Sequence, residues 1–304
     1  MISFNRKKKI NIFRKKGIIE FNQLLNKKKC NDLYKKIIKS RSWGDNLFKS
    51  EKVFQKKQQY KRTNPGKGKF NLAEKFNLNF IENSKEIKSI LNDILGKDYE
   101  IVIKKFVVAV PESWIPYWLK QKVKNSLAPN LGPFIKNKYR DVTYFRGIDY
   151  HMDQIDFPNH SSDFVTLYIY LNDTTSKMSP LNILEGSHIF GQTKFPHIIK
   201  KCQNNNYLKY GDKLDNLKRF KKKKLVGKSG TVYIWSSLTL HGTKPQENKD
   251  DFRISLRYII RKSNKVYKTT EINNLIKNIS PIKTMRDDVD PKNFKQLKFD
   301  KVLR

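Results

Sequence analysis

Residues 164–171 read FVTLYIYL and alternate between two kinds of side chain. Positions 165, 167, 169 and 171 are aliphatic, and the alternate positions carry three aromatic residues and one threonine. Successive side chains of a β-strand point to opposite faces, so this period of two predicts a strand. The stretch FRISLRYII at 252–260 alternates in the same way. Two such stretches, far apart in the chain, indicate a sheet built from distant segments.

Working outward, the sequence places helices first and strands afterwards. Apolar residues recur at helical spacing in 31–38 and in 84–95, where Gly96 is a natural stop. The other strand-like runs are 101–110, 142–145 and 230–235. Many strands without intervening helices favour an antiparallel double sheet. We therefore expect a mostly β protein with flanking helices around a double-stranded β-helix (jelly roll, cupin-like) core.

The expected domain organisation is a single domain in three parts. Residues 1–98 form an N-terminal basic arm and a helical region, 99–262 the double-stranded β-helix core, and 263–304 a polar C-terminal tail. Within the core, 111–141 is expected to be a long connection. The polar segment 200–224 is expected to be a surface loop.

The chain of 304 residues is strongly basic, with a formal net charge of +36. Such a charge is compatible with a nucleic acid or an anionic membrane. Its lysines are nevertheless scattered along the whole chain among many Asn and Ile residues, and we expect no specific nucleic-acid partner. Two distant cysteines, Cys30 and Cys202, favour a reducing compartment, which we take to be the cytoplasm. No apolar run has the length of a membrane span.

The candidate chemistry lies in His151, Asp153 and His241. On an extended segment, residues i and i+2 face the same side, so His151 and Asp153 can hold one ion. His241 comes much later and must return on another strand. Two imidazoles and one carboxylate leave other coordination positions open, which is the ligand set of non-haem Fe(II) oxygenases. The plainer interpretation of His151 and Asp153 is that they cap a loop.

A candidate anion site follows on the last clear strand. Arg253 and Ser255 share one face of that strand, and Arg253 follows His241 at a distance that a hairpin can close. A guanidinium can bind a carboxylate through two hydrogen bonds, and the serine hydroxyl can add a third. A dicarboxylate could therefore bind the metal at one end and Arg253 at the other. The alternative is that Arg253 is a surface residue.

These motifs together resemble the phytanoyl-CoA dioxygenase family of Fe(II)/2-oxoglutarate oxygenases. The resemblance covers about residues 20–262 and rests on YHMD at 150–153, SPL at 179–181, GSH at 186–188, and the HG and FRIS motifs at 241–242 and 252–255. It implies that His151, Asp153 and His241 bind Fe(II) and that Arg253 holds 2-oxoglutarate. It also implies a structural role for His188. Tyr168 stands where many members have tryptophan, and we expect it beside the co-substrate with Ser255.

The resemblance implies a hydroxylase of a small-molecule substrate that consumes dioxygen and converts 2-oxoglutarate to succinate and CO2. Asp153 favours hydroxylation, because related halogenases are similar but have a small residue there. Two alternatives stay open. One is a nucleic-acid-directed 2-oxoglutarate oxygenase, in which Arg257 would act as a second functional arginine. The other is a non-catalytic jelly-roll module that binds an anionic ligand.

His160 and His197 have no comparable context, and we expect His160 to be solvated.

Overall fold

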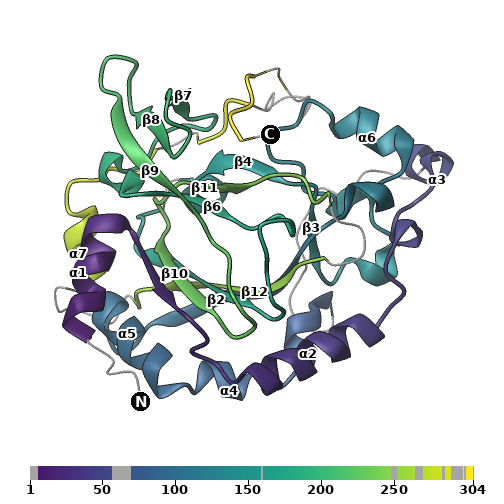
Figure 1. The fold of residues 1–304 in the computed structure, drawn as a ribbon, viewed down its shortest axis with the longest axis horizontal. Coiled ribbons are helices and arrows are strands. Elements are labelled where there is room, and N and C mark those ends of the chain that lie inside the picture. The colour runs from purple at the N-terminus through teal and green to yellow at the C-terminus, as the bar shows by residue number, and fades with distance from the viewer. Residues whose placement is uncertain are drawn as a thin grey trace.

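Two six-stranded sheets lie at the centre of the protein in the computed structural model (Figure 1). The structure describes residues 6–56, 70–158, 160–247, 252–263, 270–282, 285–288, 297 and 299–303. The first sheet has the order β1 (Ile18–Phe21), β10 (Val232–Ser236), β5 (Phe164–Tyr170), β12 (Ile254–Arg261), β2 (Glu100–Ala109) and β3 (Thr143–Phe145). The second has the order β4 (Ile148–His151), β11 (His241–Thr243), β6 (Asn182–Glu185), β9 (Lys218–Lys224), β8 (Tyr207–Gly211) and β7 (Ile198–Lys201). Neighbouring strands are antiparallel except β2 and β3, which are parallel. The expected mostly β, jelly-roll fold is confirmed.

The strand predicted from 164–171 is β5, and it lies inside the first sheet between β10 and β12. Its aliphatic side chains belong to the main core, which the helices complete. On its other face, Tyr168 and Tyr170 pack against Ile183 of the second sheet. The alternation in the sequence thus separates a helix-facing side from a side that faces the space between the sheets.

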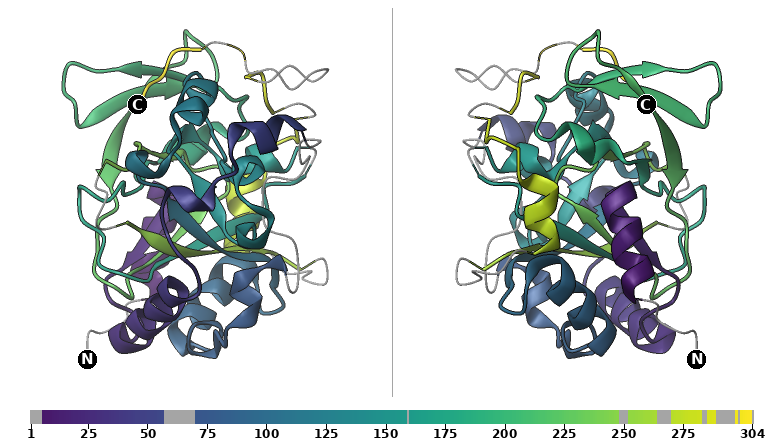
Figure 2. Two further views of the ribbon diagram at one scale, coloured as in Figure 1. Left: turned by 90° about the vertical axis from the view of Figure 1, so that its right-hand side faces the viewer. Right: turned by 90° about the vertical axis from the view of Figure 1, so that its left-hand side faces the viewer.

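Helices cover the outer face of the first sheet (Figures 1 and 2). They are α1 (Arg6–Lys16), α2 (Lys27–Lys39), α4 (Asn79–Glu82), α5 (Lys85–Leu95) and α7 (Glu271–Ile276). The two helices predicted from apolar stripes are α2 and α5, and both contribute buried residues to the main core. Gly96 follows α5, as the sequence indicated, and the structure shows that Ser84 caps its start. The cap of α2 is Asn26, whose side chain accepts a hydrogen bond from the Lys29 amide.

One expectation for the irregular segments was wrong. Residues 200–224 are not a surface loop, because they contain β8, β9 and the end of β7. The basic arm contains the helix α1, whose Phe13 is fully buried. The C-terminal region contains α7 and buries Ile272, Met285 and Leu303. These elements were not predicted, because each buries only a few apolar side chains within a polar, lysine-rich stretch of sequence.

Short helices occupy the connections. They are α3 (Glu51–Lys56), α6 (Tyr117–Val123), and the 3-10 turns η1 (Asp45–Leu47), η3 (Leu72–Lys75), η4 (Glu112–Trp114), η5 (Gly132–Phe134), η6 (Asn137–Tyr139), η7 (Asp153–Asp156) and η8 (Ser187–Phe190). The long connection at 111–141 therefore holds one helix and several turns. Among the described residues, no helix combines the length and the apolar character that crossing a membrane requires.

Candidate metal centre

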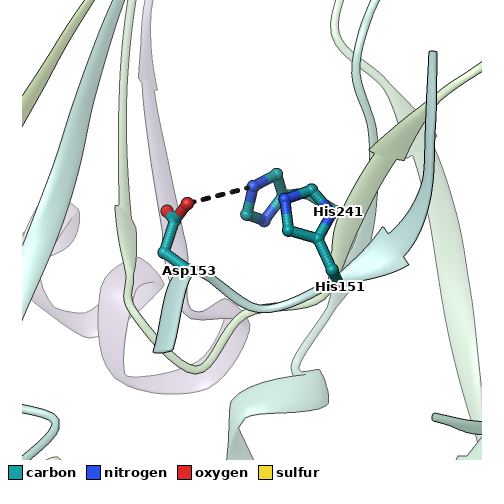
Figure 3. A group of neighbouring side chains, drawn as sticks. All are labelled: His151, Asp153 and His241. Carbon is teal, nitrogen blue, oxygen red and sulfur yellow. Dashed lines mark ion pairs between the residues drawn. The ribbon is translucent and has the colours of Figure 1, made fainter. Parts of the chain in front are cut away.

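The three predicted ligands meet on the second sheet, at the side that faces the first (Figure 3). His151 ends β4 and His241 begins β11, and the two residues stand directly opposite each other in the register. Met152 is extended and turns away into a buried cluster, so that Asp153 opens η7 beside the histidines. One ligand atom from each side chain lies within 4.8 Å of the others. The spacing in the sequence therefore corresponds to a real cluster.

Both imidazoles are held in one tautomer by the backbone. The Nδ1 atom of His151 lies 3.0 Å from the carbonyl oxygen of Asp149, and that of His241 lies 3.0 Å from the carbonyl oxygen of Thr239. A carbonyl oxygen only accepts, so Nδ1 of each ring carries the proton and donates it. Each Nε2 then keeps its lone pair, as a metal ligand must.

The electrostatic environment keeps His151 neutral. Burial, followed by the neighbouring His241, lowers the pKa of His151 well below its usual value. The ring centroids of the two histidines are 4.3 Å apart, so two imidazolium charges would repel strongly there. A neutral His151 imidazole in this position is ready to bind a cation.

Asp153 is fixed by side chains from three other strands. Its Oδ2 atom accepts hydrogen bonds from the Thr166 hydroxyl at 2.5 Å and from the Trp235 indole N–H at 2.9 Å. Its Oδ1 atom lies 3.5 Å from Nε2 of His241 and forms an ion pair with Arg257. Burial alone would raise the pKa of Asp153, but Arg257 and the neighbouring His241 and His151 together outweigh it, and the pKa ends well below its usual range. The carboxylate is therefore ionised, and Oδ1 is the oxygen that faces the histidines.

The partners of Asp153 lead to a first prediction. We expect Trp235→Phe to weaken metal binding about 10- to 100-fold, because it removes the indole N–H that orients the carboxylate but keeps an aromatic ring in place. Tyr233→Phe is the matched control: it lies on the same face of β10, and its hydroxyl donates to the Val226 carbonyl and contacts no candidate ligand. Anaerobic Fe(II) titration of both variants measures the difference. Equal affinities for the two would show that the indole does not support the site.

Arg253, Ser255 and Tyr168 also come together. Arg253 is only 2% exposed. Its Nε donates to the Ser179 carbonyl at 3.1 Å, and its Nη1 donates to the Ser255 hydroxyl at 2.9 Å and to the Tyr168 hydroxyl. In the described part of the chain, no carboxylate forms an ion pair with this guanidinium. A buried cation without an opposite charge is costly, so the arrangement suits an anionic ligand.

An aromatic chain connects the two groups of residues. The Trp235 ring centroid is 5.0 Å from that of His241 and 5.4 Å from that of Tyr168. Trp235 thus touches the candidate metal centre on one side and the tyrosine that contacts Arg253 on the other. The two sites are therefore neighbours within the same interior.

Sequence reasoning missed several contacts around Asp153. It named Arg257 only as a possible second functional arginine, on the strand face of Arg253 and Ser255, and did not foresee its ion pair with Asp153. Lys105 stands directly opposite Arg257 on β2 and is buried. Burial, followed by repulsion from Arg257, lowers the pKa of Lys105 to about 7. The two lysines at 104–105, inside the apolar run 101–110, were the available signal. Thr166 and Trp235 gave no signal of their own.

The other histidines lie away from the three candidate ligands. His188 is buried, and its Nε2 lies 3.1 Å from the carbonyl oxygen of Arg14 in α1, which agrees with a structural role. His160 is exposed. His197 is buried, and its Nδ1 lies 2.8 Å from the Thr193 hydroxyl. None of the three belongs to the candidate cluster.

Comparison with solved structures identifies the fold. The epimerase SnoN from nogalamycin biosynthesis, in complex with Fe3+, alpha ketoglutarate and nogalamycin RO, is similar with a TM-score of 0.50 and 10% sequence identity, over 98% of this chain and 94% of that chain. The chain and SnoN therefore share the jelly-roll fold. The alpha-ketoglutarate-dependent carbocyclase SnoK from the same biosynthesis is similar with a TM-score of 0.49 and 12% identity, over 97% and 94% of the two chains. No protein-family model and no curated protein sequence matches the chain, so the likeness to the phytanoyl-CoA dioxygenase family rests on the motifs alone.

Proposed function

We propose that this protein is an Fe(II)- and 2-oxoglutarate-dependent dioxygenase that hydroxylates a small-molecule substrate. The observation that carries the proposal is the pairing of two sites: a His-Asp-His cluster with its metal-binding atoms turned inward, and a buried Arg253 beside it. SnoN binds iron and alpha ketoglutarate on a similar fold, which supports the same assignment here.

Each residue has a defined role in this proposal. Nε2 of His151, Nε2 of His241 and Oδ1 of Asp153 would hold the iron, and this donor set suits Fe(II) with open positions for further ligands. Arg253 would bind the distal carboxylate of 2-oxoglutarate, with the Ser255 hydroxyl beside it. With both bound, the iron centre supplies oxidative decarboxylation of 2-oxoglutarate to succinate and CO2, coupled to insertion of one oxygen atom of dioxygen into a C–H bond.

The remaining residues hold this arrangement in place. Thr166 and Trp235 fix the carboxylate of Asp153, so that only Oδ1 is directed at the metal. The carboxylate fills a coordination position that related halogenases leave for a halide, which favours hydroxylation. The two backbone carbonyls fix the imidazole tautomers, so that each Nε2 atom is left available to a metal.

Succinate formation tests the proposal without knowledge of the substrate. We expect purified protein with Fe(II), ascorbate, dioxygen and 2-oxoglutarate to form succinate slowly, because many similar enzymes turn over without their prime substrate. Omitting Fe(II) should abolish the product. The control is His188→Gln, which changes a buried histidine outside the cluster and should retain Fe(II)-dependent turnover. Iron binding without any 2-oxoglutarate consumption would contradict the proposal and favour a non-catalytic module that binds an anion.

A further inference from the structure

Strands β7, β8 and β9 extend the second sheet beyond the body of the protein (Figures 1 and 2). They carry most of the lysines of the segment 198–224. The register decides which of these side chains share a face. Lys200 stands directly opposite Lys209, and Lys209 stands directly opposite Arg219. Three cations therefore form one row across three neighbouring strands. We call this row with its neighbour Lys221 the basic platform.

The platform has no internal compensation for its charge. Lys200, Lys209, Arg219 and Lys221 are all exposed, and none forms an ion pair within the described part of the chain. Two carboxylates near the platform already have other partners: Glu185, opposite Lys221, lies 3.1 Å from the ammonium group of Lys16, and Glu20 pairs with Lys223. Like charges directly opposite each other on adjacent strands destabilise a sheet. An external anion bound to these side chains would reduce the repulsion between them.

A simpler explanation covers only part of the platform. Lysines on an edge strand prevent unwanted pairing with other sheets, and β7 is such an edge. Strand β8 is paired on both sides, so Lys209 has no edge to protect. Arg219 on β9 is likewise internal. Protection of a sheet edge therefore does not explain the presence of Lys209 and Arg219.

The platform also contains an aromatic residue. Tyr207 stands opposite Lys221 on the same face, and the guanidinium of Arg219 lies 3.9 Å from the centroid of its ring. Cations interleaved with an aromatic ring on a sheet face are typical of surfaces that bind single-stranded nucleic acid. Neighbouring strands are about 4.8 Å apart, so the row of three is about 10 Å long and can meet two or three phosphates.

We propose that the basic platform binds the phosphodiester backbone of a nucleic-acid strand without sequence preference. An anionic membrane fits less well. The β8–β9 turn beside the platform places Asp212 and Asp215 on either side of Lys213 and Leu214, and Leu214 is its one strongly exposed large apolar side chain. The two carboxylates would be repelled by anionic lipid. The platform itself offers cations and Tyr207.

The platform belongs to the same sheet face as the candidate metal ligands. Through the register, His241 stands opposite Ile183, and Ile183 stands opposite Lys223 in β9. From β11 to β8 there are three strand spacings, or about 14 Å. A bound strand would lie beside the metal centre and would not contact it. The proposal is therefore independent of the iron chemistry, and it can be tested on the protein with or without Fe(II).

The test compares two variants that lose the same charge. Lys200→Gln/Lys209→Gln/Arg219→Gln removes the row, and Lys35→Gln/Lys36→Gln/Lys39→Gln removes three exposed lysines from α2. Binding of fluorescein-labelled oligothymidylate is measured by anisotropy between about 50 and 200 mM salt. We expect the platform variant to bind about tenfold more weakly or worse, and its log–log salt slope to fall by about 2, because about 0.7 counterions are released per phosphate contact. The α2 variant should change affinity less than about threefold and keep its slope.

Further measurements separate the remaining explanations. A mixed-sequence oligonucleotide should bind the unmodified protein as tightly as oligothymidylate, since phosphate contacts carry no sequence information. Equal weakening in both triple variants would overturn the proposal, because it would show that overall charge alone attracts the strand. Vesicles containing phosphatidylserine provide the other comparison. Loss of vesicle binding in the platform variant, with oligonucleotide binding unchanged, would also overturn it and assign the face to a membrane.

Discussion

Asp153→Ala is expected to weaken Fe(II) binding more than about 100-fold, because loss of a partner outside the ligand set already costs about 10- to 100-fold. The substitution removes the only charged ligand and leaves two neutral imidazoles. It also leaves Arg257 beside the histidines without its ion pair. A cation would then enter a site that is positively charged. We expect His151→Ala and His241→Ala to weaken binding sharply as well, since two remaining ligands do not define the site.

The control for this prediction is Asp156→Ala. Asp156 lies in the same 3-10 turn as Asp153 and is exposed, so the variant loses the same charge without losing a candidate ligand. Asp153→Asn is the second variant, because it keeps the shape of the side chain if the alanine protein folds poorly. The measurement is anaerobic titration of the metal-free protein with Fe(II). Unchanged Fe(II) affinity in all three ligand variants would show that these residues do not form a metal centre.

The contrast between β5 and β9 shows what the sequence could and could not predict about the fold. Strand β5 was predictable because apolar residues fill every second position, and this pattern is the direct signature of a strand with one face in the core. Strand β9 reads KRFKKKK and has only Phe220 as a buried apolar residue. A single buried side chain per strand is too weak a pattern to distinguish from a polar loop. Its pairing with β6 and β8 depends on those neighbouring strands, which the local sequence of β9 does not reveal.

The site shows a similar division. His151 and Asp153 were predictable because their contact depends on local geometry, and His241 because the family resemblance supplies it. Trp235 and Thr166 hold the same carboxylate, but they do so from strands β10 and β5. Nothing in the local sequence of either residue says which strands face Asp153. Residues that support a ligand from another sheet become visible only when the sheets are stacked.

Arg253→Lys is expected to reduce 2-oxoglutarate affinity roughly 30- to 1000-fold, equivalent to about 2–4 kcal/mol, if Arg253 binds the distal carboxylate. Lysine keeps the charge but loses the planar group that makes two parallel hydrogen bonds. The loss is large because the guanidinium is buried and its hydrogen-bond partners in the described structure are all neutral. Iron binding should be unchanged, since none of the three candidate ligands contacts Arg253.

The measurement is the dependence of Fe(II)-driven succinate formation on 2-oxoglutarate concentration, without prime substrate. Arg261→Lys is the matched control: Arg261 ends β12, the strand that begins directly after Arg253, is half-buried, and pairs with Glu100 at 2.9 Å. We expect it to behave as the unmodified protein. A thermal melt of both variants separates a loss of co-substrate binding from a loss of folding, since Arg253 also holds the Ser179 carbonyl. If Arg253→Lys keeps full 2-oxoglutarate affinity, the carboxylate is held elsewhere, and Arg257, the next arginine on the same face of β12, becomes the residue to test.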